Sequence, residues 1–196
     1  MYRKSFVKGF LAGLYHIAFR VKKVGTENLD MDDGYIICAN HLNYLDAAGI
    51  VLLNKRYIRF VAKSDLYRIP ILSWLGHLFN IIPIKRGKND IASIKICLKA
   101  LKNKEVLGIF PEGTRNGIKK GLKPKTGVAY FALNSNATVI PVGIKGGEKP
   151  FKKATITYGK PLDLEGYKGN KELKKDKEIL VEVTGKIMEK IIELAE

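Results

Sequence analysis

Residues 35–46 have the sequence YIICANHLNYLD, and this stretch decides how the chain is organised. Its first half, Tyr35 to Ala39, is a continuous apolar run typical of a strand buried inside a parallel sheet. A helical pattern follows from Leu45 to Leu53, so the polar residues between them lie where a strand ends and a helix begins. Ligands of open α/β sheets bind at such strand ends. We therefore expect the functional site around His41.

The same stretch holds His41 and, five residues later, Asp46. An aspartate in the first turn of a helix can fold back to one imidazole nitrogen and leave the other free as a base. The two residues would then form a catalytic dyad. The alternative is that His41 belongs to a turn and that Asp46 is an acid favoured by the positive end of the helix dipole. This stretch alone leaves both interpretations open.

The composition indicates one packed domain with an anionic partner. The chain has 196 residues, of which 46% are hydrophobic, which fits a single core and excludes a disordered chain. Its net charge of +16 fits nucleic acid, an acidic membrane, a phosphorylated substrate or an acidic protein. Cys38 and Cys97 lie among apolar neighbours, so we expect reduced core residues in a cytosolic protein. The sequence has no metal-ligand spacing, and we expect no metal.

Residues 1–24 hold six Lys or Arg and no Asp or Glu. As a helix they place Lys4, Lys8, His16 and Arg20 on one stripe and Phe6, Phe10, Leu14 and Ile17 on the other side. The apolar part, residues 9–19, would be roughly 16 Å long, well short of the ~30 Å hydrocarbon core of a bilayer. We expect a basic amphipathic helix in the interface of an anionic membrane, at the cytoplasmic face, in a peripheral or monotopic protein. The alternative is a helix that covers the domain's own core.

The rest of the pattern predicts an α/β fold, a single domain with a mostly parallel or mixed central sheet flanked by helices. After a first strand at 17–24, residues 25–196 would form this domain without an internal linker. Strands are predicted at 35–39, 57–62, 81–85, 106–110, 138–144 and 154–158, and helices at 46–53, 71–80, 91–101, 126–133 and 171–196. The apolar segment 71–84 is either plain core or the lining of a slot for a long hydrocarbon chain.

A second polar cluster, Pro111-Glu112-Gly113-Thr114-Arg115, follows the strand that ends at Phe110. The arginine fork, the threonine hydroxyl and a glycine that admits backbone amides suit a phosphate, although in isolation an ordinary turn is the alternative. Both strand ends and the apolar segment together indicate a substrate with a hydroxyl, a phosphate and a fatty chain.

These residues resemble a known family, the glycerolipid acyltransferases. Asn40-His41 with Asp46 is similar to their His-x4-Asp motif, and residues 110–115 match their Phe-Pro-Glu-Gly-Thr-Arg motif. Similar features between and after these motifs are Lys63, Leu66, Pro70, Gly76, Arg86 and residues 139–142. The resemblance covers about residues 35–145 and is greatest to the bacterial 1-acylglycerol-3-phosphate acyltransferases, which make phosphatidic acid. Asn43 and Asp65 depart from the family pattern, which usually has Ser and Glu there.

The resemblance implies transfer of an acyl group from a thioester of acyl carrier protein or coenzyme A to the sn-2 hydroxyl of lysophosphatidic acid. His41 would take the hydroxyl proton, and Asp46 would fix the tautomer of its ring. The phosphoglycerol would be bound by Glu112, Gly113, Thr114 and Arg115, with Lys63 and Arg86 adding positive charge. It implies no cofactor besides the acyl donor.

Two other functions fit part of the pattern. One keeps the chemistry with another acceptor, glycerol 3-phosphate or a different lysolipid. The other is a basic nucleic-acid-binding protein, which the net charge of +16 permits. The aromatic residues, however, lie within apolar runs and do not alternate with Lys or Arg, and no nucleic-acid motif is present. We therefore expect no nucleic-acid partner.

Overall fold

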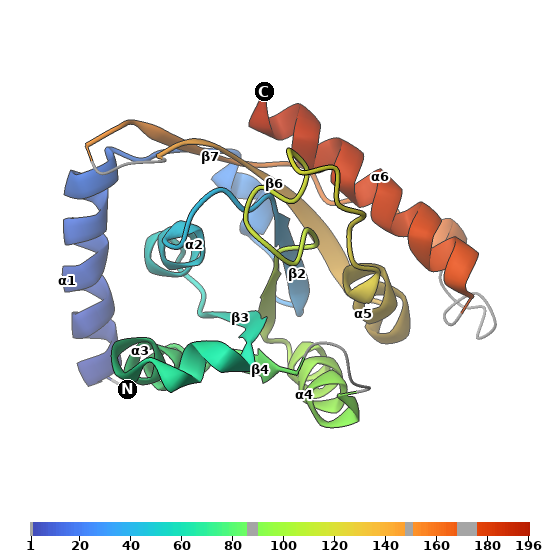
Figure 1. The fold of residues 1–196 in the computed structure, drawn as a ribbon, viewed down its shortest axis with the longest axis horizontal. Coiled ribbons are helices and arrows are strands. Elements are labelled where there is room, and N and C mark those ends of the chain that lie inside the picture. Colours follow the sequence, from blue (N-terminus) through green and yellow to red (C-terminus); the bar gives the residue numbers. More distant parts are fainter. Residues whose placement is uncertain (1, 86–89, 148–150, 168–175) are drawn as a thin grey trace.

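The structure is a computed structural model that describes residues 2–85, 90–147, 151–167 and 176–196, with side chains from residue 6. One seven-stranded sheet has the order β1-β7-β6-β2-β5-β3-β4, and all neighbouring strands are parallel except β6 and β7. Helices cover both faces (Figure 1). The strands are β1 (Lys22–Val24), β2 (Tyr35–Ala39), β3 (Ile58–Lys63), β4 (Ile82–Ile84), β5 (Val106–Ile109), β6 (Thr138–Gly146) and β7 (Ala154–Tyr158). The helices are α1 (Tyr2–Phe19), α2 (Asp46–Leu53), α3 (Pro70–Leu78), α4 (Ile91–Lys102), α5 (Gly127–Ser135) and α6 (Lys177–Ala195), with short 3-10 turns η1 (Thr26–Leu29), η2 (Ser64–Arg68) and η3 (Glu165–Tyr167).

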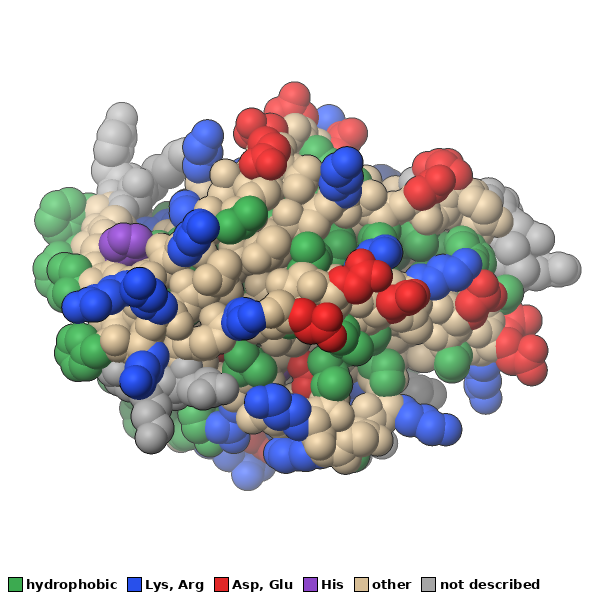
Figure 2. Space-filling view, turned by 90° about the horizontal axis from the view of Figure 1, so that it is seen from above, with side chains coloured by type: hydrophobic (Ala, Val, Ile, Leu, Met, Phe, Trp, Pro, Cys, Tyr) green, Lys and Arg blue, Asp and Glu red, His purple; other side chains and the backbone are tan. Residues whose placement is uncertain are grey.

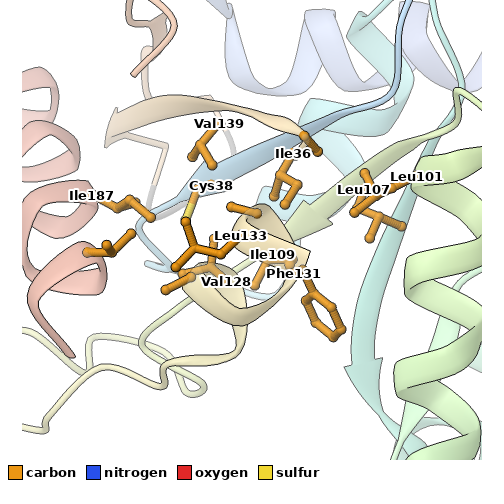
Figure 3. Close-up of a cluster of buried hydrophobic side chains, with 14 of the residues drawn as sticks. Ile36, Cys38, Leu101, Leu107, Ile109, Val128, Phe131, Leu133, Val139 and Ile187 are labelled. Atoms are coloured by element: carbon orange, nitrogen blue, oxygen red, sulfur yellow. The ribbon is translucent and has the colours of Figure 1, made fainter. Parts of the chain in front are cut away.

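The predicted α/β domain with a mixed sheet is therefore confirmed, and β2 shows why its sequence is apolar throughout. Ile36 and Cys38 pack with α4, α5 and α6 on one face, whereas Ile37 packs with α2 and the end of α1 on the other. Figure 3 shows Cys38 beside Leu133 and Ile187 in the first of these cores. Both cysteines are buried and free, as predicted, and burial raises the pKa of the Cys38 thiol.

The strand predicted at residues 17–24 is wrong for residues 17–21, because α1 continues to Phe19 and β1 begins at Lys22. The Arg20 backbone N–H still donates to the His16 carbonyl over 2.8 Å, and a left-handed φ of 43° at Arg20 then ends the helix. Phe19 and Val21 are 4% and 6% exposed and fix the turn in the core. These two buried residues, two positions apart, produced the alternation that predicted a strand.

The apolar stripe of α1 faces outward. Phe6, Phe10, Leu14 and Ile17 are 79%, 61%, 50% and 69% exposed, so this stripe does not cover the core. The opposite face of α1 packs along α2, and there Gly49 admits the Tyr15 ring, because a Cβ at position 49 would lie 2.5 Å from the Tyr15 hydroxyl oxygen.

Lys8, which the helical pattern places on the basic stripe, is buried between α1 and the end of α2. Its Nζ donates to the Asn54 carbonyl over 2.7 Å and lies 4.5 Å from the centre of the Tyr57 ring. Burial lowers the pKa of Lys8. The carbonyl at the carboxyl end of α2, which has no partner within its own helix, explains why a lysine is accommodated here.

The apolar segment 71–84 is not plain core where it forms α3. Ile71 and Trp74 are 66% and 57% exposed, and Gly76 is the buried residue of this helix. Its role as the lining of a hydrocarbon slot stays a prediction. Among the described residues, no helix combines the length and the hydropathy that crossing a bilayer requires.

Candidate active site

The two polar clusters predicted from the sequence meet at one edge of the sheet. β2 and β5 are parallel neighbours, with Cys38 paired to Ile109, so their carboxyl ends lie side by side. His41 follows β2 and residues 111–115 follow β5. A direct bond joins the two loops, since the Asn116 backbone N–H donates to the His41 carbonyl over 2.6 Å.

His41 and Asp46 are in contact. Asp46 Oδ2 lies 2.9 Å from His41 Nδ1 and also accepts the backbone N–H groups of Leu42 and Asn43 over 2.6 and 2.8 Å. Asp46 is 3% exposed and begins α2, so its carboxylate stabilises the preceding turn and contacts the histidine at the same time. Because a carboxylate only accepts, a neutral imidazole in this position carries its proton on Nδ1 and its lone pair on Nε2.

Aromatic stacking holds the imidazole plane. The His41 ring lies 4.1 Å from the Phe110 ring at an interplanar angle of 9°, and Phe110 in turn stacks on Phe60 at 5.0 Å. The His41 side chain retains 19% exposure. The stacking and the carboxylate together fix the ring and leave part of its surface exposed.

Glu112 connects the two loops through backbone groups. Its Oε1 accepts the N–H of His41 over 2.7 Å, and its Oε2 accepts the N–H of Ile118 over 2.9 Å. Glu112 is 4% exposed. Both carboxylate oxygens are therefore occupied inside the protein, in an arrangement different from the phosphate contact that the sequence suggested.

Arg115 lies beside the dyad loop, over the ring of Tyr44. Its guanidinium carbon is 3.4 Å from the ring centre, a cation–π contact. Gly113 has a φ of 67°, which a glycine adopts at low cost, and this turn leaves Thr114 and Arg115 half-buried. Sequence reasoning missed Tyr44, because an exposed tyrosine within a polar loop carries no pattern.

Two further cations, Lys63 and Arg86, were predicted for the site. Lys63 ends β3, the neighbour of β5, and is paired with the Asp65 carboxylate. The hydrogen bond from Lys63 lowers the pKa of Asp65. Arg86 lies outside the described residues.

Two asparagines of the first loop form hydrogen bonds to backbone groups that the motif did not predict. Asn40 is 4% exposed and exchanges two hydrogen bonds with the backbone of Ile144, at 2.9 and 2.7 Å, so its side chain continues the pairing of β2 with β6. Asn43 accepts the N–H of Leu45 over 2.7 Å and donates to the Gly147 carbonyl over 3.1 Å. The described residues contain no group of three or more His, Cys, Asp or Glu placed to hold a metal ion.

Comparisons with known proteins match this geometry to one kind of enzyme. A protein-family model described as Acyltransferase matches residues 20–145. The chain is 32% identical to the 1-acyl-sn-glycerol-3-phosphate acyltransferase of Bacillus subtilis, over 72% of this chain and 73% of that protein. It is 29% identical to the chloroplastic 1-acyl-sn-glycerol-3-phosphate acyltransferase LPAT1 of Arabidopsis thaliana, over 74% of this chain and 46% of that protein. It thus spans under half of the plant protein's length.

A solved structure shows a similar fold. The crystal structure of the 1-acyl-sn-glycerophosphate (LPA) acyltransferase PlsC from Thermotoga maritima matches with a TM-score of 0.66 and 25% sequence identity. The match covers 95% of this chain and 80% of that one, so it includes the sheet and its flanking helices.

Proposed function

The chain belongs to the acyltransferase family, and on this premise we propose that it transfers a fatty acyl group from an acyl thioester to the sn-2 hydroxyl of lysophosphatidic acid, making phosphatidic acid. The observation that carries the proposal is the 2.9 Å contact between His41 Nδ1 and the buried Asp46 carboxylate. It leaves Nε2 as the free basic atom at the sheet edge where Arg115 also lies.

In the proposed reaction, His41 Nε2 takes the proton from the acceptor hydroxyl as its oxygen attacks the thioester carbonyl carbon. The new C–O bond forms, the C–S bond breaks, and the imidazolium returns the proton to the departing sulfur. Asp46 holds Nδ1–H throughout and stabilises the imidazolium. The acyl group passes directly to the acceptor, and the donor is a thioester of coenzyme A or of acyl carrier protein.

At the other end of the acceptor, Arg115 is proposed to bind the phosphate with its planar fork of donors, assisted by Gly113 and Thr114. Tyr44 supports this by holding the guanidinium 3.4 Å above its ring. Lys63 and Arg86 are proposed to add positive charge to the approach. Glu112 is proposed to hold the two loops in place and not to contact the acceptor, because its two oxygens are bonded to backbone N–H groups.

The membrane contact is proposed to be the exposed stripe of α1, which consists of Phe6, Phe10, Leu14 and Ile17. Side chains of this size in the interfacial layer contribute about 1.5–3 kcal/mol each when they leave water completely. The protein would lie on the cytoplasmic face as a peripheral protein, with α1 parallel to the bilayer plane.

The test measures free thiol released from a long-chain acyl thioester by the purified protein. Release is expected only when lysophosphatidic acid is added, and a monoacylglycerol of the same chain should be a poorer acceptor because Arg115 has no anion to bind. His41→Ala should lower the rate by about 10²- to 10⁴-fold.

A matched control is His77→Ala, which removes an exposed histidine of α3 that bonds the Ser73 carbonyl over 2.7 Å, and it should keep the full rate. Thiol release without any acceptor would indicate a thioesterase, and release with glycerol 3-phosphate alone would reassign the acceptor. Full activity in His41→Ala would end the proposed mechanism.

A further inference from the structure

A hollow of about 640 Å³ opens at the carboxyl end of α1, apart from both catalytic loops. Its lining residues are His16, Ile17, Arg20, Val21, Lys22 and Phe151. Figure 2 views the molecule from this end and shows basic and hydrophobic side chains together at its left, where α1 lies in Figure 1. Its walls thus combine three basic and three apolar side chains.

The frame of the hollow is fixed by the fold. Phe19 and Val21 are buried in the core on either side of the turn that ends α1. From the far side, the Phe151 backbone N–H donates to the Ala18 carbonyl over 2.5 Å, which ties the chain before β7 to the helix end. The basic side chains therefore project from anchored backbone.

Among the described residues, the charged side chains that line the hollow are all basic. Within the described residues, no carboxylate is paired with His16, Arg20 or Lys22, whereas the nearby Lys8 and Lys23 are engaged by the Asn54 and Leu53 carbonyls. The carboxyl end of a helix carries about half a negative charge, which disfavours an anion there. Two full positive charges, and a third when the histidine is protonated, exceed this opposing charge.

The rim of the hollow is apolar and continuous with the outward stripe of α1. Ile17 is 69% exposed and lies one and two turns along the helix from Leu14 and Phe10, and Phe151 across the hollow is 73% exposed. A free anion would gain no binding energy from an apolar rim. An amphiphile with an anionic head would, because its chains can lie beside the stripe while its head enters the hollow.

We propose that this hollow binds the phosphate headgroup of an anionic phospholipid of the bilayer on which α1 rests. Arg20 and Lys22 contact the phosphate, His16 adds a donor, and Ile17 and Phe151 meet the first carbons of the acyl chains. The inference rests on the membrane contact included in the proposed function, and it assigns that contact a headgroup site distinct from the acceptor phosphate site at Arg115.

The first experiment is sedimentation of the full chain with vesicles of phosphatidylcholine alone or mixed with phosphatidic acid. The variant is Arg20→Gln/Lys22→Gln, since Gln tolerates the left-handed φ at position 20 as Arg does. Its apparent affinity for the acidic vesicles should fall by about tenfold or more, with no change for the neutral ones. The control is Lys95→Gln/Lys99→Gln on α4, which covers the other face of the sheet. It removes equal charge and should lower the apparent affinity for the acidic vesicles by less than about threefold.

The second experiment keeps the native chain and follows its three histidines by NMR, with His16→Gln assigning the His16 signal. Dihexanoyl phosphatidate should shift this signal in a saturable way, at lower concentration than inorganic phosphate. Equal potency of the two would overturn a lipid site in favour of a simple anion site, and the absence of saturation would overturn any site. Equal losses for both double variants in sedimentation would indicate diffuse charge attraction and would also refute the proposal.

Both measurements omit the acyl donor, so they separate this inference from the proposed reaction. A chain that binds phosphatidate as expected but transfers no acyl group would refute the reaction alone. An active chain without the headgroup effects would refute this site alone.

Discussion

Replacing Glu112 by Gln tests whether this residue organises the site or contacts the substrate. The carboxylate is 4% exposed and accepts one backbone N–H at each oxygen, from His41 at 2.7 Å and from Ile118 at 2.9 Å. Gln has the same shape, but one of its terminal atoms is an amide nitrogen, which only donates. Whichever way the amide is turned, one of the two backbone N–H groups then faces another donor.

The cost follows from these two bonds. A hydrogen bond to a charged group contributes about 1.5–3 kcal/mol, and a buried donor without a partner costs about 1–3 kcal/mol. Removing a buried charge offsets part of this loss, so the free energy of unfolding should fall by about 2–4 kcal/mol. Because His41 is held through its own backbone N–H, and a displacement of about 1 Å can cost 10²-fold, kcat should fall by about 10- to 100-fold.

Urea unfolding and steady-state kinetics measure these quantities. The KM for lysophosphatidic acid should change by less than about threefold, because Glu112 is placed to touch no substrate. The control is Glu105→Gln. The half-exposed Glu105 carboxylate pairs with Arg59 at 3.0 Å, and its replacement should lower the free energy of unfolding by no more than about 1 kcal/mol. Tighter acceptor binding with unchanged stability in Glu112→Gln would refute the reasoning, since that is the effect of removing a negative charge beside a bound phosphate.

Three further variants test other parts of the site and the membrane contact. Asp46→Asn should lower kcat by about 10²- to 10⁴-fold, and combining it with His41→Ala should add little in the same thiol assay, because the two residues act as one unit. Tyr44→Ala should raise the KM for lysophosphatidic acid by about two- to fivefold while Tyr44→Phe leaves it unchanged, and an effect of the Phe variant would point to the hydroxyl instead of the ring. Phe10→Ser with Leu14→Ser should weaken sedimentation with vesicles without lowering the melting temperature, since both side chains are exposed, and a lower melting temperature would place them in the core.

Much of the loop that holds His41 and Asp46 could be predicted from the sequence because its determinants are local. The buried strand β2, the polar break after it and the five-residue spacing of His41 and Asp46 all lie within residues 35–46. A helix that begins at Asp46 places its carboxylate within reach of the preceding loop, and the 2.9 Å contact is the result. The neighbouring position of β5 is a tertiary fact. The sequence suggested it only indirectly, through the rule that ligands of α/β sheets bind at strand ends and through the resemblance to a known family.

The partners of Glu112 could not be predicted, because backbone N–H groups are common to every residue except proline. The motif suggested a substrate contact for each of its polar side chains, but burial decides which of them can reach a substrate. Glu112 is enclosed, whereas Arg115 is half-buried and rests on Tyr44, a residue far away in the sequence. Such a pair leaves no periodicity for sequence reasoning to detect.

The two faces of α1 show why the sequence pattern did not predict that Lys8 is buried. A lysine can be buried on the inner face when a carbonyl at the end of another helix accepts a hydrogen bond from it, as the Asn54 carbonyl does at 2.7 Å. On the same face the Tyr15 hydroxyl donates over 3.3 Å to the Leu45 carbonyl, one residue before Asp46. Desolvation and the nearby Asp46 carboxylate raise the pKa of Tyr15, which favours the protonated hydroxyl as the donor of this bond. The helix proposed to rest on the membrane therefore also packs against the residue that precedes Asp46.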